Sequence, residues 1–235
     1  MSPHKPRQIH LIRHGTSSAN IAHILAGRIP GVKLTTEGSR EALAVGNYLA
    51  QKSTLPISHI FHSPLERTKQ TATQISKALS EKSSRDPQII RAPFLIEMDY
   101  GDWSGRKISQ LALKPLWKKI QSQPSAVRFP NGESFLEAQA RLIDGIFNEV
   151  LTPLKPGYSA VIVSHGDPIK VILNHFLGAS LDAFQKISIN PASLSTLTFS
   201  GEHAMVSAMN IQVDQLISTS SATVGGELNK KKGKA

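Results

Sequence analysis

The chain has 235 residues, of which 40% are hydrophobic, so it can bury a sizeable core and fits one large α/β domain. It contains no cysteine, which excludes a disulfide framework, a thiol nucleophile and a thiolate metal site. Its apolar runs fall short of the roughly 18 residues that a membrane span needs, and Met1 to Gln8 lacks the apolar centre of a signal peptide. We therefore expect a cytoplasmic protein with no membrane partner.

The formal net charge of +10 raises the question of nucleic-acid binding. Glu227 to Ala235 contributes +3 of this charge, from four lysines against one glutamate, which leaves +7 on the rest of the chain. Because the segment has little to bury, we predict a domain over residues 1–215 and a disordered basic tail over residues 216–235. An excess of basic residues also suits an anionic small-molecule substrate, and we expect no nucleic-acid partner.

Apolar runs and helical patterns alternate along the chain. The strand-like runs are Ile9 to Ile12, Ile57 to Phe61, Ile89 to Ile96, Ala160 to Val163 and Leu194 to Phe199, with Ala204 to Ile211 as a further candidate. Helical patterns cover Thr36 to Lys52, Pro64 to Glu81 and Phe135 to Leu151, the last with Leu136, Ala140, Ile143, Phe147 and Val150 in helical register. This alternation predicts a three-layer α/β/α fold, with helices on both faces of a mostly parallel sheet.

Three helix starts carry capping signals. The stretches SPLE from Ser63 and SFLE from Ser134 each predict a capping box with the glutamate three residues later. In DPIK, Asp167 is the expected N-cap, and Gly178 is placed to end that helix. Ser104 to Pro130 is expected to form an irregular or helical insertion over the sheet edge, where such segments often shape a substrate mouth.

Basic residues follow three of the predicted strands. LIRHG ends the first strand at Arg13 and His14, SPLERTKQTA puts Arg67 in the first turn of a helix, and VIVSHGDP ends a strand at His165 and Gly166. Because open α/β sheets bind ligands at the carboxyl ends of their strands, we expect these residues to meet over one edge of the sheet.

Two histidines and two arginines suit phosphoryl transfer. Imidazole is nucleophilic when neutral, and neighbouring arginines lower its pKa. Guanidinium groups match phosphate oxygens, and we expect the glycine after each histidine, Gly15 and Gly166, to let a phosphate approach the backbone. The arrangement predicts a phosphate pocket with a histidine nucleophile.

A leaving alkoxide needs a proton, and FLIEMDYGDWSG supplies three candidate acids, Glu97, Asp99 and Asp102. Glu97 ends an apolar run, which favours partial burial and a raised pKa, although spacing alone does not choose among the three.

Six blocks in this order resemble the histidine phosphatase superfamily, in its phosphoglycerate-mutase-like branch, over Ile9 to about Phe199. The blocks are LIRHGTSSAN, LTTEGSREA, SPLERTKQTA, EMDYGDWSG, PNGESF and VIVSHGDPIK. The resemblance implies that His14 becomes phosphohistidine, that Glu97 donates the proton and that Asn20 lines the phosphate site. It also implies that Arg13, Arg67 and His165 hold the phosphoryl group, and that no metal and no cofactor are used.

Departures from the resemblance favour a phosphatase over a mutase. The cofactor-dependent mutases have glutamate where this chain has Thr16 and tryptophan where it has Ala19, and their middle insertion is longer. A mutase must exclude water from its intermediate, which takes a more enclosing lid. Thr16 and Gly166 are further candidates for phosphate contacts, and Arg28 either contacts the leaving group or faces water.

Other residues have simpler explanations. His59 and His62 are three apart on a predicted strand, so they point to opposite faces and do not suit a shared metal. For His62, a position at the pocket rim and a position away from it both stay open. Trp103 and Trp117 are expected to pack rather than to stack on bases.

The sequence therefore predicts an enzyme that hydrolyses phosphomonoesters of small metabolites, with the phosphorylated substrate as its partner. The alternatives are a cofactor-dependent phosphoglycerate mutase and a non-catalytic module that binds phosphorylated ligands. A homodimer is a candidate assembly. The natural substrate is not identified, because the loops at Ala26 to Leu34 and Ser104 to Pro130 resemble the family least.

Overall fold

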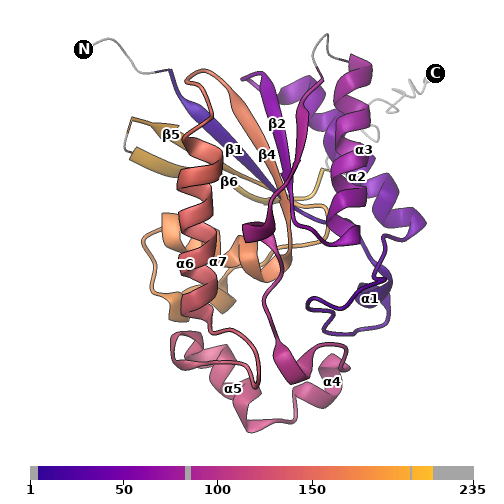
Figure 1. Ribbon diagram of the computed structural model, residues 1–235, viewed down its shortest axis with the longest axis vertical. Coiled ribbons are helices and arrows are strands. Elements are labelled where there is room, and N and C mark those ends of the chain that lie inside the picture. The colour runs from indigo at the N-terminus through magenta and orange to yellow at the C-terminus, as the bar shows by residue number, and fades with distance from the viewer. Residues whose placement is uncertain (1–4, 83–85, 202, 214–235) are drawn as a thin grey trace, which may run out of the picture.

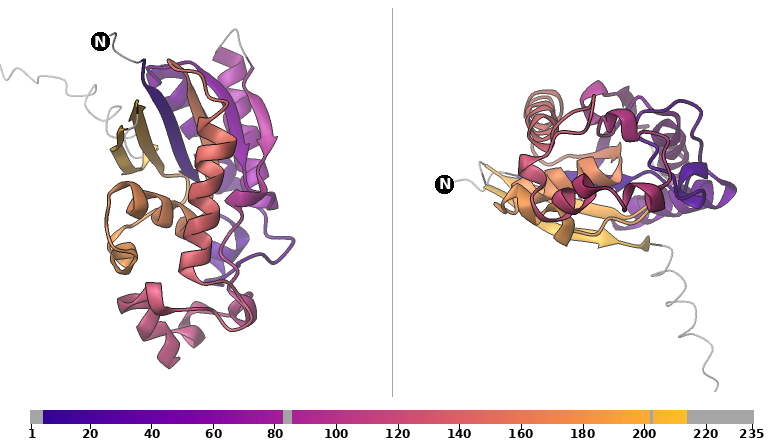
Figure 2. Two further views of the ribbon diagram at one scale, coloured as in Figure 1. Left: turned by 60° about the vertical axis from the view of Figure 1, so that its left-hand side comes forward. Right: turned by 90° about the horizontal axis from the view of Figure 1, so that it is seen from below.

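The computed structural model describes residues 5–82, 86–201 and 203–213, so the predicted basic tail over residues 216–235 lies outside the described residues. A six-stranded sheet forms the centre, with α2 and α3 on one face and α6 and α7 on the other (Figures 1 and 2), which confirms the predicted three-layer α/β class. The strands are β1 (Arg7–Arg13), β2 (Ile57–His62), β3 (Gln88–Arg91), β4 (Ser159–Ser164), β5 (Leu194–Ser200) and β6 (His203–Ile211). The α-helices are α1 (Ser18–Ile21), α2 (Thr36–Lys52), α3 (Glu66–Lys82), α4 (Ile108–Leu111), α5 (Pro115–Ser122), α6 (Phe135–Gly145) and α7 (Gly166–Phe176).

The order of the strands brings distant parts of the chain together. The sheet runs β3-β2-β4-β1-β5-β6, with β1 to β4 parallel to one another and β5 antiparallel to both of its neighbours. Arg13, the last residue of β1, lies opposite Ser164, the last residue of β4. The two residues that follow, His14 and His165, therefore emerge side by side.

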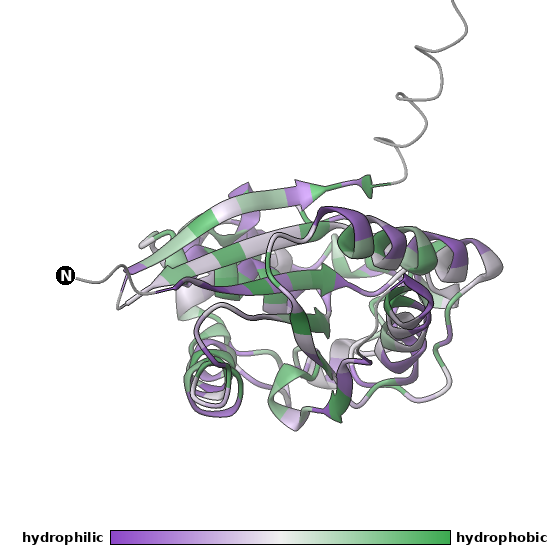
Figure 3. Ribbon diagram, turned by 90° about the horizontal axis from the view of Figure 1, so that it is seen from above, coloured by the Kyte–Doolittle hydropathy of each residue, from purple (hydrophilic) through white to green (hydrophobic). Residues whose placement is uncertain are grey.

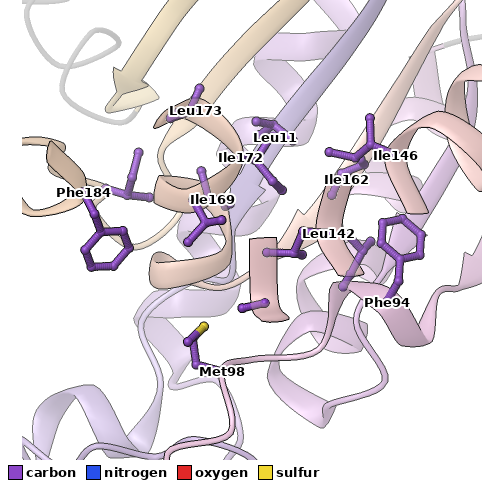
Figure 4. Packing of buried hydrophobic residues seen from close by; sticks show 14 of the residues in the cluster. Leu11, Phe94, Met98, Leu142, Ile146, Ile162, Ile169, Ile172, Leu173 and Phe184 are labelled. Carbon is purple, nitrogen blue, oxygen red and sulfur yellow. The ribbon is translucent and has the colours of Figure 1, made fainter. Parts of the chain in front are cut away.

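The core occupies both faces of the sheet. Leu11 and Ile162 point toward α6 and α7, where they pack against side chains such as Ile169 and Leu142 (Figure 4). Alternate residues of the same strands, such as Ile12, belong to a second apolar cluster beneath α2 and α3. Figure 3 shows the central strands coloured mainly as hydrophobic, as expected for strands covered on both sides.

The predicted strand over Ile89 to Ile96 is too long. β3 ends at Arg91, because Pro93 begins a 3-10 helix, η1 (Pro93–Leu95). Proline has no N–H to donate to the sheet and suits the first turn of a helix instead.

Two of the predicted helix caps are wrong. Ser63 does not cap α3, which begins at Glu66; its hydroxyl contacts His165 instead. Asp167 is also not an N-cap, because α7 begins one residue earlier and the Asp167 carboxylate accepts a hydrogen bond from Tyr100. The capping box at Ser134 is confirmed, and Gly178 follows the end of α7 with a φ of +64°.

The segment from Phe135 to Leu151 is helical, but of the five apolar residues expected on one face only Val150 is fully buried. Leu136 and Phe147 are 55% and 46% exposed, whereas Leu142 and Ile146 are fully buried. Apolar residues stand at helical spacing on both sets of positions, so periodicity alone did not separate them. From Ile146 the helix continues as a π-helical turn, η4 (Ile146–Leu151).

The insertion over Ser104 to Pro130 forms α4, α5 and a 3-10 turn, η3 (Pro124–Ala126), beyond the lower end of the sheet in Figure 1. It joins the loop after α1 through a bridge between Ile24 and Lys107. Trp103 is buried and stacks on Trp117 at 6.2 Å between ring centroids, so both residues pack as predicted. Within the described residues, no helix has the length and apolar character needed to cross a membrane.

Candidate active site

A cavity of about 450 Å³ opens where β1 and β4 end. It is bounded by the loop after β1, the start of α7 and the segment that follows η5 (Leu181–Lys186). The predicted site residues that line it are Arg13, His14, Asn20, Arg67, Glu97 and Gly166. His165 lies just behind them: it is fully buried, with its ring centroid 5.3 Å from that of His14. The parallel sheet therefore brings together most of the residues expected at one site.

His14 has the geometry of a neutral imidazole. Its Nδ1 lies 2.8 Å from the carbonyl oxygen of Gly15 and donates to it, which leaves Nε2 as the acceptor. Nε2 accepts a hydrogen bond of 3.2 Å from the Nε–H of Arg67. Burial, followed by the charges of Arg13 and Arg67, lowers the pKa of His14 well below its ordinary value. The Nε2 lone pair therefore stays available at neutral pH.

The two arginines are held by backbone carbonyl groups. Arg67 is buried and donates to the carbonyl oxygen of Gly27 at 2.9 Å, and Arg13 donates to that of Ile189 at 2.7 Å. The Nε of Arg13 is buried without a hydrogen-bond partner among the described residues. A Cβ added at Gly166 would lie 3.5 Å from the Arg13 guanidinium, which is an ordinary van der Waals contact.

His165 is oriented by Ser63, a residue whose role the sequence analysis missed. The Ser63 hydroxyl lies 2.8 Å from Nε2 of His165, and the N–H of Leu65 contacts the same oxygen at 3.5 Å. The Ser63 hydroxyl can donate to Nε2, and in that tautomer the imidazole proton is on Nδ1. Nδ1 lies 3.8 Å from Oε2 of Glu97 and has no hydrogen-bond partner in the described part of the chain.

Glu97 is the only one of the three candidate acids that lines the cavity as described. Its Oε1 accepts the N–H of Met98 at 2.9 Å. Burial first, and the negative charge of Asp167 second, raise the pKa of Glu97 to about 7. Asp99 instead pairs with Arg28, and Asp102 accepts from Asn131.

Two further candidates have other partners. The N–H and hydroxyl of Thr16 both donate to the carboxylate of Glu41, at 2.8 and 2.9 Å. Arg28 donates to the carbonyl oxygen of Glu97 at 2.8 Å and forms ion pairs with Asp99 and Glu133, so it neither faces water freely nor lines the cavity. Arg28 fixes the backbone that carries Glu97.

Asn20 lines the cavity with its amide. Its Oδ1 accepts from the N–H and the hydroxyl of Ser17, at 2.9 and 2.8 Å. The Nδ2 group makes no hydrogen bond with the other described residues, so it can donate to a ligand in the cavity.

Gly15 has a different role from the one expected. A Cβ added there would lie 2.2 Å from the carbonyl oxygen of Gly38, in the first turn of α2, and a Cβ on Gly38 would lie 2.0 Å from that of Thr16. Glycine is therefore required at Gly15 by the close approach of two backbone segments, rather than by room for a phosphate.

The structure also adds cavity residues that the sequence analysis did not select. Tyr100 donates to Asp167 at 2.7 Å, and Lys170 and Gln185 line the same space. Of these cavity residues, only Asp167 was noticed in the sequence. It lies two residues after the second histidine, a position that also fits a helix cap.

The second pair of histidines does not form a metal site. His59 contacts Ser58, and Nδ1 of His62 contacts the carbonyl oxygen of Ser63; His62 does not line the cavity. Over residues 5–82, 86–201 and 203–213, no group of three or more potential metal ligands is found.

Comparison with known proteins identifies the family. A model of the histidine phosphatase superfamily, branch 1, matches residues 9–212, so the chain belongs to that superfamily, and the predicted resemblance is confirmed. The chain is 30% identical over 172 residues to a 2,3-bisphosphoglycerate-dependent phosphoglycerate mutase of Bartonella henselae, covering 71% of this chain and 80% of that relative. It is 27% identical over 206 residues to phosphoserine phosphatase 1 of Hydrogenobacter thermophilus, covering 86% and 90% of the two chains.

Solved structures agree on the fold. The alpha-ribazole phosphatase of Shigella flexneri matches with a TM-score of 0.73 at 22% identity, covering 87% of this chain and 96% of that one.

Proposed function

We propose that the protein hydrolyses phosphomonoesters of small metabolites through a phosphohistidine on His14, without a metal or other cofactor. The observation that carries this proposal is the neutral, buried His14, whose Nε2 lone pair faces Arg67. The guanidinium groups of Arg13 and Arg67, which line the cavity, supply donors for phosphate oxygens next to it, with His165 directly behind them. Family membership and the phosphatases among the relatives support the same chemistry.

In the first step, Nε2 of His14 attacks phosphorus, and the bond from phosphorus to the ester oxygen breaks. Glu97 donates its proton to the departing alkoxide, which leaves as the alcohol. The guanidinium groups of Arg13 and Arg67 stabilise the charge on the phosphoryl oxygens, helped by the N-terminus of α7 at Gly166.

In the second step, the Glu97 carboxylate accepts a proton from water as the water oxygen attacks phosphorus. The bond from phosphorus to Nε2 breaks, inorganic phosphate forms, and His14 and Glu97 return to their starting protonation states.

The test is the loss of both activity and covalent labelling in His14→Ala. We expect at least about a thousandfold loss of kcat/KM with p-nitrophenyl phosphate, and loss of an acid-labile phosphoryl label from a rapidly quenched reaction. His203→Ala, an exposed histidine of β6, is the matched control and should keep both. Full activity in His14→Ala would refute the proposal.

A phosphoglycerate mutase is the second candidate, because the relative from Bartonella henselae carries that name. Thr16 favours hydrolysis. The mutases carry a glutamate at this position, whereas Thr16 donates hydrogen bonds to Glu41. Conversion of 3-phosphoglycerate to 2-phosphoglycerate that depends on added 2,3-bisphosphoglycerate would decide for the mutase. A cytoplasmic location and a homodimer stay predictions.

A further inference from the structure

A second set of polar side chains lines the same cavity. The start of α7 contributes Asp167 and Lys170, and Tyr100 and Gln185 reach the same space from other segments. Tyr100 donates to Oδ2 of Asp167 at 2.7 Å, and Nζ of Lys170 lies 3.9 Å from Oδ1. Lys170 also donates to Gln185 at 3.4 Å. These contacts hold one carboxylate and one ammonium group beside the space that the leaving alcohol must enter.

The charges of the cavity balance without a charged leaving group. Arg13 and Arg67 match the two negative charges of a phosphomonoester. Lys170 is matched by Asp167, and Arg28, which holds the Glu97 backbone, is paired with Asp99 and Glu133. Among the residues that line the cavity as described, no cation remains for a carboxylate on the substrate.

Part of the cavity lining is apolar. Ile24 and Leu25 from the loop after α1, with Ile108 from α4, line the same space. A lining that combines carbon surface with hydrogen-bonding groups suits an alcohol that carries both hydroxyl groups and a carbon skeleton.

We infer that Asp167 is a specificity-determining residue that makes the site select phosphomonoesters of uncharged, hydroxyl-bearing alcohols and reject leaving groups with a carboxylate. This inference rests on the proposed function and narrows it to a substrate class. The Asp167 side chain lines the cavity and is 26% exposed, so its negative charge interacts with a bound ligand. The Tyr100 hydroxyl keeps it in place: burial and the nearby carboxylates raise the pKa of Tyr100 well above its ordinary value, so it remains a donor.

Three esters of the same three-carbon skeleton test this inference. Glycerol 3-phosphate has an uncharged leaving alcohol, 3-phosphoglycerate replaces one CH₂OH group by a carboxylate, and phosphoserine has that carboxylate with an ammonium group in place of the remaining hydroxyl. We expect kcat/KM for glycerol 3-phosphate to exceed that for 3-phosphoglycerate by about tenfold or more, the effect of one uncompensated charge at a partly exposed site.

Asp167→Asn removes the charge but keeps an oxygen that accepts from Tyr100, so the contact between α7 and Tyr100 is preserved. In this variant the ratio of the two kcat/KM values should fall about tenfold, toward parity. Tyr100→Phe should keep the preference, because the carboxylate remains. Asp144→Asn removes the same charge from the exposed side of α6 and should leave the ratio unchanged.

Two results would overturn the inference: a wild-type preference for 3-phosphoglycerate or phosphoserine, or a ratio that Asp167→Asn changes by less than about twofold. Both leave the proposed function intact, because hydrolysis through His14 is still observed. Failure to hydrolyse any of these esters or p-nitrophenyl phosphate overturns the proposed function, and with it the inference.

Discussion

At the residue scale, the proposed role of Glu97 as proton donor predicts how kcat/KM depends on pH. Its pKa of about 7 lies above that of an ordinary carboxyl, so the proton needed by the leaving group is present below pH 7 and is lost as the pH rises. We expect kcat/KM for an alkyl phosphate to fall above pH 7, approaching about tenfold per unit. His14 adds no fall on this side, since its pKa is lowered and it is already neutral. A flat profile between pH 7 and 9 would contradict the assignment of Glu97.

The identity of the proton donor can be separated from its pKa by changing the leaving group. In Glu97→Gln we expect kcat/KM for glycerol 3-phosphate to fall by about 10² to 10⁴, because an alkoxide leaves poorly without a proton. p-Nitrophenolate leaves readily unprotonated, so p-nitrophenyl phosphate should lose far less. Equal losses with both esters would show that Glu97 acts on binding or on the fold. Asp99→Asn tests the neighbouring acid, which pairs with Arg28 outside the cavity.

Site residues could be predicted from the sequence where they stand at the end of a strand. Arg13, His14 and His165 were found because each stands at the carboxyl end of an apolar run, and the register of β1 and β4 brings these ends together. Ser63 could not be assigned, because its partner His165 is 102 positions away and a serine before proline equally predicts a helix cap.

At the scale of elements, the contact between Gly15 and Gly38 joins the end of β1 to the start of α2. Alanine at Gly38 would raise helix propensity by up to about 1 kcal/mol, but its Cβ would overlap the Thr16 carbonyl oxygen at 2.0 Å. We expect the overlap to dominate and Gly38→Ala to destabilise the protein by about 2 kcal/mol, measured by urea unfolding. Gly178→Ala is the comparison: it meets open space, so its positive φ alone should cost about 1 kcal/mol. A stabilised Gly38→Ala variant would show that the backbone can separate here.

Elements with a strong pattern could be predicted, and those that depend on tertiary contacts could not. The range of α2 matches its prediction from Thr36 to Lys52, because a capped start and a single apolar face define it. η5 carries no such pattern, yet its Gln185 and the residues up to Asn190 form one wall of the cavity. The residues of this wall of the cavity could therefore be identified from the structure but not from the sequence.

At the scale of the whole molecule, the described residues of the site all lie between Arg13 and Asn190, and the buried core extends to Val213. We expect a chain that ends at residue 215 to keep kcat/KM within about twofold and its Tm within about 2 °C. The predicted basic tail would then serve neither folding nor catalysis. A larger loss of either quantity would contradict the predicted domain boundary. Measuring nucleic-acid affinity in both chains tests the remaining role that its charge suggests.

The sequence predicted one mostly parallel sheet, but not the order of its strands. Parallel neighbours require only that the intervening helices cross over the sheet, so many orders fit the same alternation. The observed order places β4 between β1 and β2, so the strand end that leads to His165 lies between those that lead to His14 and to Arg67.

The division of the cavity between two kinds of support has an evolutionary consequence. The proposed reacting groups His14 and His165 directly follow strands β1 and β4, whereas much of the rest of the cavity is lined by α4, the loop after α1 and the segment after η5. Connecting segments tolerate exchange far better than strands do. Descendants of one ancestral chain could thus acquire new substrates by swapping surface segments while inheriting the reaction unchanged. Exchanging the same connecting segments is also a way to engineer a different substrate specificity.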